Sequence, residues 1–503
     1  MTGPRADFEE VFEYGFTRLD PVRGDHIDPP SVAIYETLLT KGPDGLPAPG
    51  LAQNWQISAD GMSWRLRLHE GARFHSGDPC DSRAVVEALE LCRWGEGLPR
   101  QVWYWDPVDS VRSLDDLTVE VRLLFPCARL PVLLWGTHTA IANPRTWREW
   151  GDDFGVTAAD GTGLYRLVSF SPTAVTAELV GTPQIGQPHT LRWSSVVDDE
   201  ERAHCLSSRQ FDAVREVPAT SVSSDDARWR IDSQPQASQF YLALSFPAGF
   251  DHLPLRRAVN GLIDRDALVA SALNGAGHPA TSPLPVIDEF AGDYTPTVDQ
   301  SLARAQATQE LATMGFRPGA DGILERDGFV LDLECATQDT AVFRRLANEL
   351  TQQLAPFGIR LRFNYLQPFE DFYRSVADGP DSFLSKWLWQ DGMEAAMGFS
   401  SSDCIEPAGG NWQRSMIPAV DDAFDSFLRA REGELRGAAE NAQRLFMENL
   451  PYLPLCSPTE TLAVDRAATN FGLSPRTLYP LYGDLRMTGD TRRSERSAHQ
   501  EDA

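Results

Sequence analysis

The chain has 503 residues, of which 42% are hydrophobic and 23% are charged, and this size predicts two or three domains rather than one core. Its 45 basic and 72 acidic residues leave a formal net charge of −27, which repels phosphate backbones and anionic membrane surfaces. Composition and charge therefore argue against nucleic acid as a partner and favour a neutral or cationic small-molecule ligand.

The N-terminal segment MTGPRADFEEVFEYGFTRLDPV has no basic stretch followed by an apolar stretch, so it shows no recognisable secretory signal peptide. We therefore expect a cytoplasmic protein without a membrane span, or an extracellular one if a signal peptide has been removed. The seven cysteines are widely spaced and contain no CxxC motif. This pattern supports neither a zinc site nor a dense disulfide framework, and we expect no metal and no cofactor.

Residues 51–68 alternate apolar and polar side chains on either side of Asp60-Gly61. This pattern predicts two antiparallel strands joined by a tight turn that requires a positive φ. A second turn at 76–79 precedes Asp81 and Ser82, either of which can cap a helix that carries apolar residues on one side. The local order is thus strand, turn, strand, turn and capped helix.

The residues of this segment closely resemble the opening segment of bacterial extracellular solute-binding proteins of family 5, the oligopeptide, dipeptide and nickel receptors of ABC importers. The shared positions are Leu51, Ala52, Trp55, Ser58, Asp60, Gly61, Trp64, Leu68, Gly71, Phe74, His75, Gly77, Pro79, Val85 and Val86. Further matching segments are 19–21, 34–39, 160–167, 255–268 and 451–455. The resemblance extends over about residues 12–485.

The resemblance implies an α/β fold with the two-lobed architecture of periplasmic binding proteins of type II (cluster C-like), with discontinuous lobes and a cleft between them. The first lobe would cover 1–243 and contain an inserted subdomain at 41–161. The second lobe would cover 244–457, and 458–488 would return to the first lobe. The polar residues 489–503 have no apolar periodicity and are predicted to be disordered.

The remaining elements follow from hydrophobic periodicity. Apolar strands are predicted at 239–246, 331–335 and 359–363, and the last two would pair in parallel through a right-handed crossover. Helices are predicted at 33–39, 200–207, 303–314, 341–354, 420–431 and 434–450. The first of these would present Tyr35 and Glu36, which we consider as cleft residues.

Segment 386–393 stands where the importers carry the pattern W-x-x-DY-x-DP, a loop whose aspartate meets the ammonium group of bound peptides in many members. The resemblance implies that Asp391 has this role, although the spacing is one residue off and Glu394-Ala395-Ala396 replaces the Asp-Pro. A carboxylate suits the task because its contact with an ammonium is charge-assisted. Trp387, Trp389 and Met393 could form an apolar wall, and Ser245 occupies the position of an asparagine common in the family.

Two functions remain open at this point. As a binding protein, the chain would trap a small peptide-like, amino-acid-like or cationic ligand between its lobes, with Asp391 holding the amine. As a cytoplasmic enzyme on the same scaffold, it would condense an amine with an aldehyde in a Pictet–Spengler reaction, with Asp391 and Glu394 as acid and base. An ABC permease would be a partner only if the protein is exported, and we expect a monomer.

Overall fold

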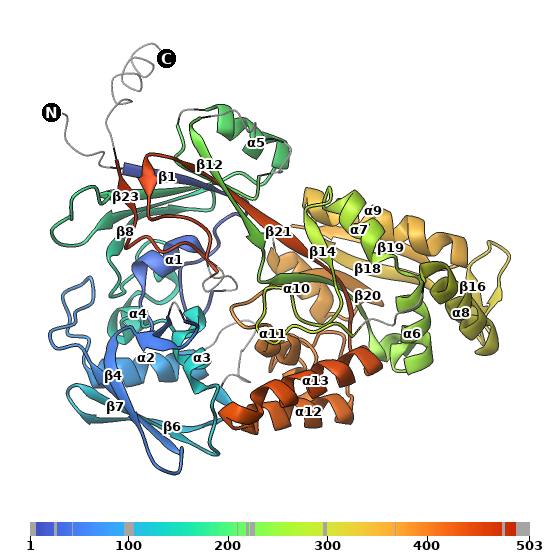
Figure 1. Cartoon of the computed structure of the whole chain (residues 1–503), viewed down its shortest axis with the longest axis horizontal. Coiled ribbons are helices and arrows are strands. Elements are labelled where there is room, and N and C mark those ends of the chain that lie inside the picture. Colours follow the sequence, from blue (N-terminus) through green and yellow to red (C-terminus); the bar gives the residue numbers. More distant parts are fainter. Residues whose placement is uncertain are drawn as a thin grey trace.

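The structure is a computed structural model (Figure 1), in which two α/β lobes lie side by side and long strands run from one to the other. The predicted disordered tail at 489–503 lies outside the described residues. The structure describes residues 7–24, 28–42, 44–94, 105–208, 210–217, 221, 227–294, 299–367, 369–474 and 478–488.

Within these residues, a 12-stranded sheet passes through both lobes. Its main path is β19 (Arg360–Leu366), β18 (Asp332–Gln338), β20 (Ser382–Leu388), β13 (Ser238–Leu244), β21 (Leu453–Asp465), β11 (Ala213–Arg215), β1 (Asp7–Phe12), β10 (Thr190–Ser195), β9 (Ala174–Leu179) and β8 (Tyr165–Ser171). Two further strands, β12 (Trp229–Pro235) and β14 (Gly277–Pro279), pair with β21.

Strand β21 joins the two lobes. Its first residues pair with β13 and β14, whereas residues 459–465 pair with β12, and 462–464 also pair with β11. Because one strand belongs to both halves of the sheet, the lobe boundaries at 243 and 457 stay a prediction.

The second lobe confirms the predicted parallel pairing. Strands β18 and β19 pair in parallel from Asp332↔Arg360 to Gln338↔Leu366, and α9 (Ala341–Leu354) connects them over the predicted range. Parallel neighbours need such a crossover, and apolar residues along one side of α9 bury it against the sheet. The other helices of this lobe are α6 (Leu253–Leu262), α7 (Arg265–Ala272), α8 (Gln300–Thr313), α10 (Phe369–Ala377), α11 (Gly392–Gly398), α12 (Pro418–Arg429) and α13 (Leu435–Asn449).

The first lobe contains a separate four-stranded sheet that confirms the predicted hairpin. Trp55 pairs with Leu66 across the hairpin, and Gly61 in the turn has a φ of +72°. The carboxylate of Asp81 accepts from the backbone N–H groups of residues 83 and 84 at 3.0 Å, and so caps the following helix. The sheet has the order β4 (Ala52–Ile57), β5 (Ser63–Leu68), β7 (Thr118–Leu123) and β6 (Val108–Asp115), with α2 (Ser82–Trp94) packed against it.

The helix predicted at 33–39 is wrong in position. The observed helix, α1, is Pro29–Ile34, and Tyr35 after it has an extended backbone with φ −116° and ψ 152°. Two prolines at its start favour an earlier beginning, because proline is pre-set for the first helical turn. The remaining short elements are β2 (Leu39–Lys41), β3 (Pro47–Pro49), α3 (Leu130–Trp135), α4 (Pro144–Trp150), α5 (Asp199–Ser207), β15 (Arg317–Pro318), β16 (Leu324–Arg326), β17 (Phe329–Val330), β22 (Ala468–Thr469) and β23 (Arg486–Met487).

The long sheet has two differently covered faces. In the second lobe, α6 to α9 pack over Phe240 and Leu384, whereas α10 to α13 pack over Tyr241 and Trp387. In the first lobe, α5 covers one face and α1 the other. We call the side with α5 and α9 the upper side and the side with α3 and α11 the lower side, as they lie in Figure 1. None of the helices in the described part of the chain has the length and apolar character needed to cross a bilayer.

Candidate functional site

The carboxyl ends of strands from both lobes meet at the boundary between the lobes. The first lobe contributes the ends of β1, β10 and β11, and the second lobe contributes those of β18 and β20. Ligands of open α/β sheets commonly bind outside the carboxyl ends of the strands. Two groups of side chains at this boundary, one on each side of the sheet, are therefore candidates for a binding site.

The lower-side group is built on the turn between β20 and α11. Asp391 is the N-cap of α11, and its Oδ1 accepts from the backbone N–H of Glu394 at 3.0 Å. The next residue, Gly392, donates its backbone N–H to Oδ2 of Asp288 at 2.9 Å. A Cβ atom at position 392 would lie 2.7 Å from that oxygen, so glycine is required for this close approach. The cap and the close contact fix the direction of the Asp391 carboxylate.

Arg129, from the opposite lobe, meets this carboxylate. It directly precedes α3, and its guanidinium donates from Nη2 to Oδ2 of Asp391 and lies with Nη1 3.7 Å from Oε1 of Glu289. The side chains of Arg129 and Asp391 are each only 9% exposed. The Asp391 carboxylate, predicted to hold a ligand ammonium, is therefore already paired with the Arg129 guanidinium from the facing lobe. Because the pair is largely buried, it is stable only if its geometry is good.

An aromatic pair lies two residues along from Asp391 and also joins the lobes. The ring of Trp389 stacks on His138 with centroids 5.9 Å apart and an interplanar angle of 24°, and Phe399 meets Trp389 edge-on at 6.1 Å. Burial lowers the pKa of His138 to about 3, so its imidazole is neutral at pH 7. A flat, partly apolar surface thus adjoins the ion pair.

Glu394 lies near the same first-lobe segment. It is 7% exposed in the first turn of α11. Burial raises the pKa of the Cys127 thiol to about 11, and the neighbouring Glu394 carboxylate adds to this effect. Since Cys127 is two residues before Arg129, both acids of α11 face one short segment of the first lobe.

Three predicted site residues are core residues instead. Trp387 and Met393 are 2% and 1% exposed within the hydrophobic core of the lower side. Tyr35 is 4% exposed in the core of the first lobe, and its hydroxyl donates to the carbonyl of Leu19 at 2.7 Å. These side chains support the site from behind and offer little surface to a ligand.

Glu36 and Ser245 are not brought into the group around Asp391. Glu36 as a whole residue is exposed. Partial desolvation of its carboxyl by neighbouring protein atoms raises the pKa of that group, and a hydrogen bond from Thr162 lowers it by a smaller amount. Ser245 follows β13, which runs antiparallel to β20, and its N–H donates to the carbonyl of Asp381. It therefore lies at the opposite end of β20 from Trp389, on the order of 20 Å away along the strand.

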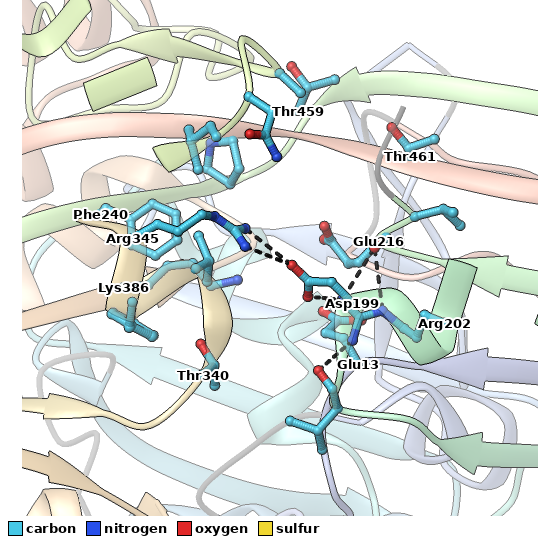
Figure 2. A pocket seen from close by; sticks show the side chains of 18 of the residues that line it. Glu13, Asp199, Arg202, Glu216, Phe240, Thr340, Arg345, Lys386, Thr459 and Thr461 are labelled. Carbon is cyan, nitrogen blue, oxygen red and sulfur yellow. Dashed lines mark hydrogen bonds and ion pairs between the residues drawn. The ribbon is translucent and has the colours of Figure 1, made fainter. Parts of the chain in front are cut away.

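The upper-side group lines a pocket of about 140 Å³ between the lobes (Figure 2). Asp199 stands in it between Arg345 of the second lobe and Arg202 of the first. None of the residues considered around Asp391 lines this pocket. The two groups are thus separate, one on each side of the sheet.

Arg129 and His138 were missed from the sequence. Arg129 is separated from Asp391 by 262 positions, and the segment FPCARLP around it has no pattern that marks a binding residue. Only the packing of the lobes reveals that these side chains share one place. Within the described ranges, no group of three or more His, Cys, Asp or Glu side chains is placed to hold a metal ion.

Two α/β lobes, joined by crossing strands and facing each other with charged and aromatic side chains, define a two-lobed solute receptor. The model of the family described as "Bacterial extracellular solute-binding proteins, family 5 Middle" matches residues 47–404, which is more than half of the chain. The chain therefore belongs to family 5 of the bacterial extracellular solute-binding proteins, which confirms the resemblance and the fold class. As a member of this family it binds a small solute between its lobes.

Individual relatives agree over nearly the whole length. The glutathione-binding protein GsiB of Pectobacterium atrosepticum is 23% identical over 482 residues, covering 92% of this chain and 91% of the relative. The oligopeptide-binding protein AppA of Bacillus subtilis, solved with a nonapeptide, superposes with a TM-score of 0.85 at 16% identity and covers 97% of this chain and 100% of its own. NikZ of Campylobacter jejuni, solved with Ni(L-His), superposes with a TM-score of 0.80 at 18% identity and covers 96% of this chain and 100% of its own.

These comparisons bear on two further predictions. The family is named for extracellular proteins, so the predicted cytoplasmic location finds no support among the relatives. The enzymatic alternative finds none either, because the relatives reported above are named as binding proteins or were solved with a bound solute.

Proposed function

We propose that the protein is the receptor for a zwitterionic, amino-acid-like or peptide-like solute, held between Arg129 and Asp391. The observation that carries this proposal is the ion pair across the lobes, in which each lobe supplies one charge. A solute with an ammonium and a carboxylate group replaces this pair by two new ones. Its ammonium binds Asp391 and its carboxylate binds Arg129, which suits bidentate recognition.

The fixed geometry of Asp391 supports this assignment. Its carboxylate is oriented by the cap of α11, so it needs little reorganisation to receive an ammonium group. Where the lobes meet, the guanidinium carbon of Arg129 lies 5.5 Å from the ring centroid of Phe290 and 5.8 Å from that of Phe427, two rings of the second lobe. Asp391 is thus fixed by its own lobe, and Arg129 is fixed by these rings once the lobes meet around the solute.

The aromatic pair defines the rest of the solute. Trp389 and His138 come from different lobes and stack, so a planar or aliphatic side chain can lie between them when the lobes close. Because His138 is neutral at pH 7, it adds no charge to this surface. Glu394, nearby and largely buried, disfavours a second anionic group on the solute.

A solved relative is consistent with this class of solute, since AppA was solved with a bound peptide. In this function the protein delivers its solute to an ABC permease from the outer side of the membrane, because a receptor of an importer must meet the permease there. Fractionation of the native host tests the location. Exclusive recovery from the cytoplasm would contradict the importer role. The monomeric state remains a prediction, which sedimentation of the purified protein can test.

The chemical test compares three ligands of equal shape. Calorimetry is performed with alanyl-phenylalanine, its desamino analogue propionyl-phenylalanine, and its C-terminal amide. We expect the dipeptide to bind at least 100-fold more tightly than either analogue, since each analogue leaves one of the two buried charges without its new partner.

The exposed Glu289 provides the matched control. Its carboxylate is 58% exposed and 3.7 Å from Arg129, so Glu289→Gln should change dipeptide affinity less than threefold. Equal affinity for the dipeptide and its desamino analogue would show that Asp391 is not the ammonium site and would overturn the proposal.

A further inference from the structure

The upper-side pocket is lined by acidic, basic and apolar side chains from both lobes. The acids are Glu13, Asp199 and Glu216, and the bases are Arg202, Arg345 and Lys386. A wall of apolar side chains, including Phe240, Phe343 and Val217, completes it. We ask which of these charges already have partners within the protein.

The basic side chains and Asp199 have partners. Arg345 donates to both the carbonyl of Ala272 and, from two nitrogens at 3.1 Å, to Oδ2 of Asp199. Arg202 donates to Oδ1 of Asp199 at 2.7 Å and, with its remaining nitrogens, to backbone carbonyls. Lys386 donates to the hydroxyl of Tyr14. Asp199 thus receives two guanidinium groups, so neither arginine is free for an anion, whereas Lys386 is held by a neutral hydroxyl.

Glu13 differs from all of these. It is 8% exposed, and its Oε2 atom is buried without a hydrogen-bond partner among the described residues. Among the described residues, Glu216 accepts a side-chain hydrogen bond from Gln236 at 2.6 Å. A buried acceptor left unpaired is costly and is normally satisfied by a ligand, an ion or water.

The surroundings add to this excess of negative charge. In and directly behind the pocket wall, four carboxyl groups of the described residues lie around two cations, Arg215 and Lys386. The four are those of Glu10, Glu13, Glu216 and Glu460. Like charges in one buried region repel, and here they raise the pKa of Glu216 to about 8, after the larger effect of its burial. An additional cation in the pocket would relieve this repulsion.

We propose that the upper-side pocket binds a small primary alkylammonium ion, with the ammonium group on Glu13 and Glu216 and the alkyl chain against the Phe240 and Phe343 wall. An ammonium group has three donors, enough for Oε2 of Glu13 and the Glu216 carboxyl. The site is separate from the Asp391 group and does not depend on the function proposed for it.

The size of the pocket limits the ligand. A cavity of about 140 Å³ is close to one of roughly 150 Å³ that accommodates benzene, so about six non-hydrogen atoms fit. n-Butylammonium, with five, matches this space and carries its charge at one end. Since the lining residues come from both lobes, an occupant contacts both and stabilises the observed arrangement of the lobes.

The test uses n-butylammonium and its neutral isostere n-butanol, titrated into the full chain by calorimetry at pH 8. We expect n-butylammonium to bind at least tenfold more tightly than n-butanol, and Glu13→Gln to reduce its affinity at least tenfold. Glu70→Gln is the control, because Glu70 is an exposed carboxylate on the turn after β5, and it should leave the affinity unchanged. Absence of binding, or equal affinities of the two probes, would overturn the proposal.

Two further variants separate this site from the other group and guard against misfolding. Ala276→Leu keeps every charge but fills pocket space, and it should abolish binding even if Glu13→Gln does not fold. Asp391→Asn should leave n-butylammonium binding unchanged. Loss of binding in Asp391→Asn with retention in Glu13→Gln would place the amine at the other group and contradict the assignment, as would full binding to Ala276→Leu.

Discussion

The two groups at the lobe boundary differ in how their charges are balanced. On the lower side, Arg129 and Asp391 form a matched pair in which each lobe supplies one sign. On the upper side, Asp199 forms ion pairs with both Arg202 and Arg345, whereas the Glu13 carboxylate has a buried oxygen without a hydrogen-bond partner in the described part of the chain. The charges of the lower-side group are therefore neutralised across the lobes, whereas the described residues in and directly behind the upper-side pocket have more carboxyl groups than cations to pair with them.

This difference indicates two kinds of ligand. A balanced pair can open and re-form around a molecule that carries both signs, so net charge is conserved when a zwitterion binds. An excess of carboxylates gains from a cation alone and rejects a molecule that also carries an anionic group. The predictions below change one of the two groups at a time.

The largest expected effect is at Asp391. Asp391→Asn should fold normally but lose about 2–5 kcal/mol of binding free energy for a zwitterionic dipeptide, because the buried ligand ammonium is then left without a carboxylate partner. Affinity for the desamino analogue should stay nearly the same. Calorimetry on both proteins decides this, and equal losses for the two ligands would show that another acid, with Glu394 next in line, holds the amine.

The next effect concerns stability on the upper side. The pKa of Glu216 is raised to about 8 in the folded state, so its stabilising contribution is present below the unfolded-state pKa near 4.5 and is lost as pH rises toward 8. Because one pKa unit corresponds to about 1.4 kcal/mol, Glu216→Gln should raise the free energy of unfolding at pH 9 by about 4 kcal/mol more than at pH 5. Denaturant unfolding at both pH values measures this. A variant destabilised equally at both would contradict the buried, partly protonated state.

A pH series distinguishes the two ligand classes. The groups that face Glu216 are Glu13, Glu460, Lys386 and Arg215, and ionising Glu216 among them favours an added cation. n-Butylammonium affinity should rise about tenfold between pH 6 and pH 9, because Glu216 loses its proton in this range. Dipeptide affinity at the Arg129–Asp391 pair should change less than threefold between pH 6 and pH 7, where the dipeptide ammonium keeps its charge. A flat n-butylammonium profile would remove Glu216 from the site.

The smallest effect is expected at Ser245. Ser245 lies at the far end of β20 from Trp389 and, among the described residues, shares no partner with the Arg129–Asp391 pair. Ser245→Ala should therefore change the free energy of dipeptide binding by less than about 0.5 kcal/mol, because distant sites without shared partners are nearly independent. The same calorimetric titration measures this. A tenfold loss would mean that the ligand extends along the whole strand from Trp389 to Ser245.

Much of the fold could be predicted from the sequence because its determinants are local. The turn at Asp60-Gly61 requires a positive φ, the cap at Asp81 satisfies its own helix, and the apolar spacing of α9 fixes both its limits and its buried side. Each depends on neighbours within a few positions. The start of α1 also has a local determinant, because Pro29 and Pro30 favour a helix that begins there rather than at residue 33.

The candidate sites depended on tertiary structure instead. The sequence by itself placed Asp391 in a loop near two tryptophans. Which side chains face a ligand is decided by the packing of α10 to α13 over the sheet, and this packing buries Trp387 and Met393. The sequence could not supply Arg129, because an ion pair between lobes depends on how two separately folded units approach each other. Nor could it show that Glu13 lacks a partner, since pairing is settled only when every neighbouring polar group has its place.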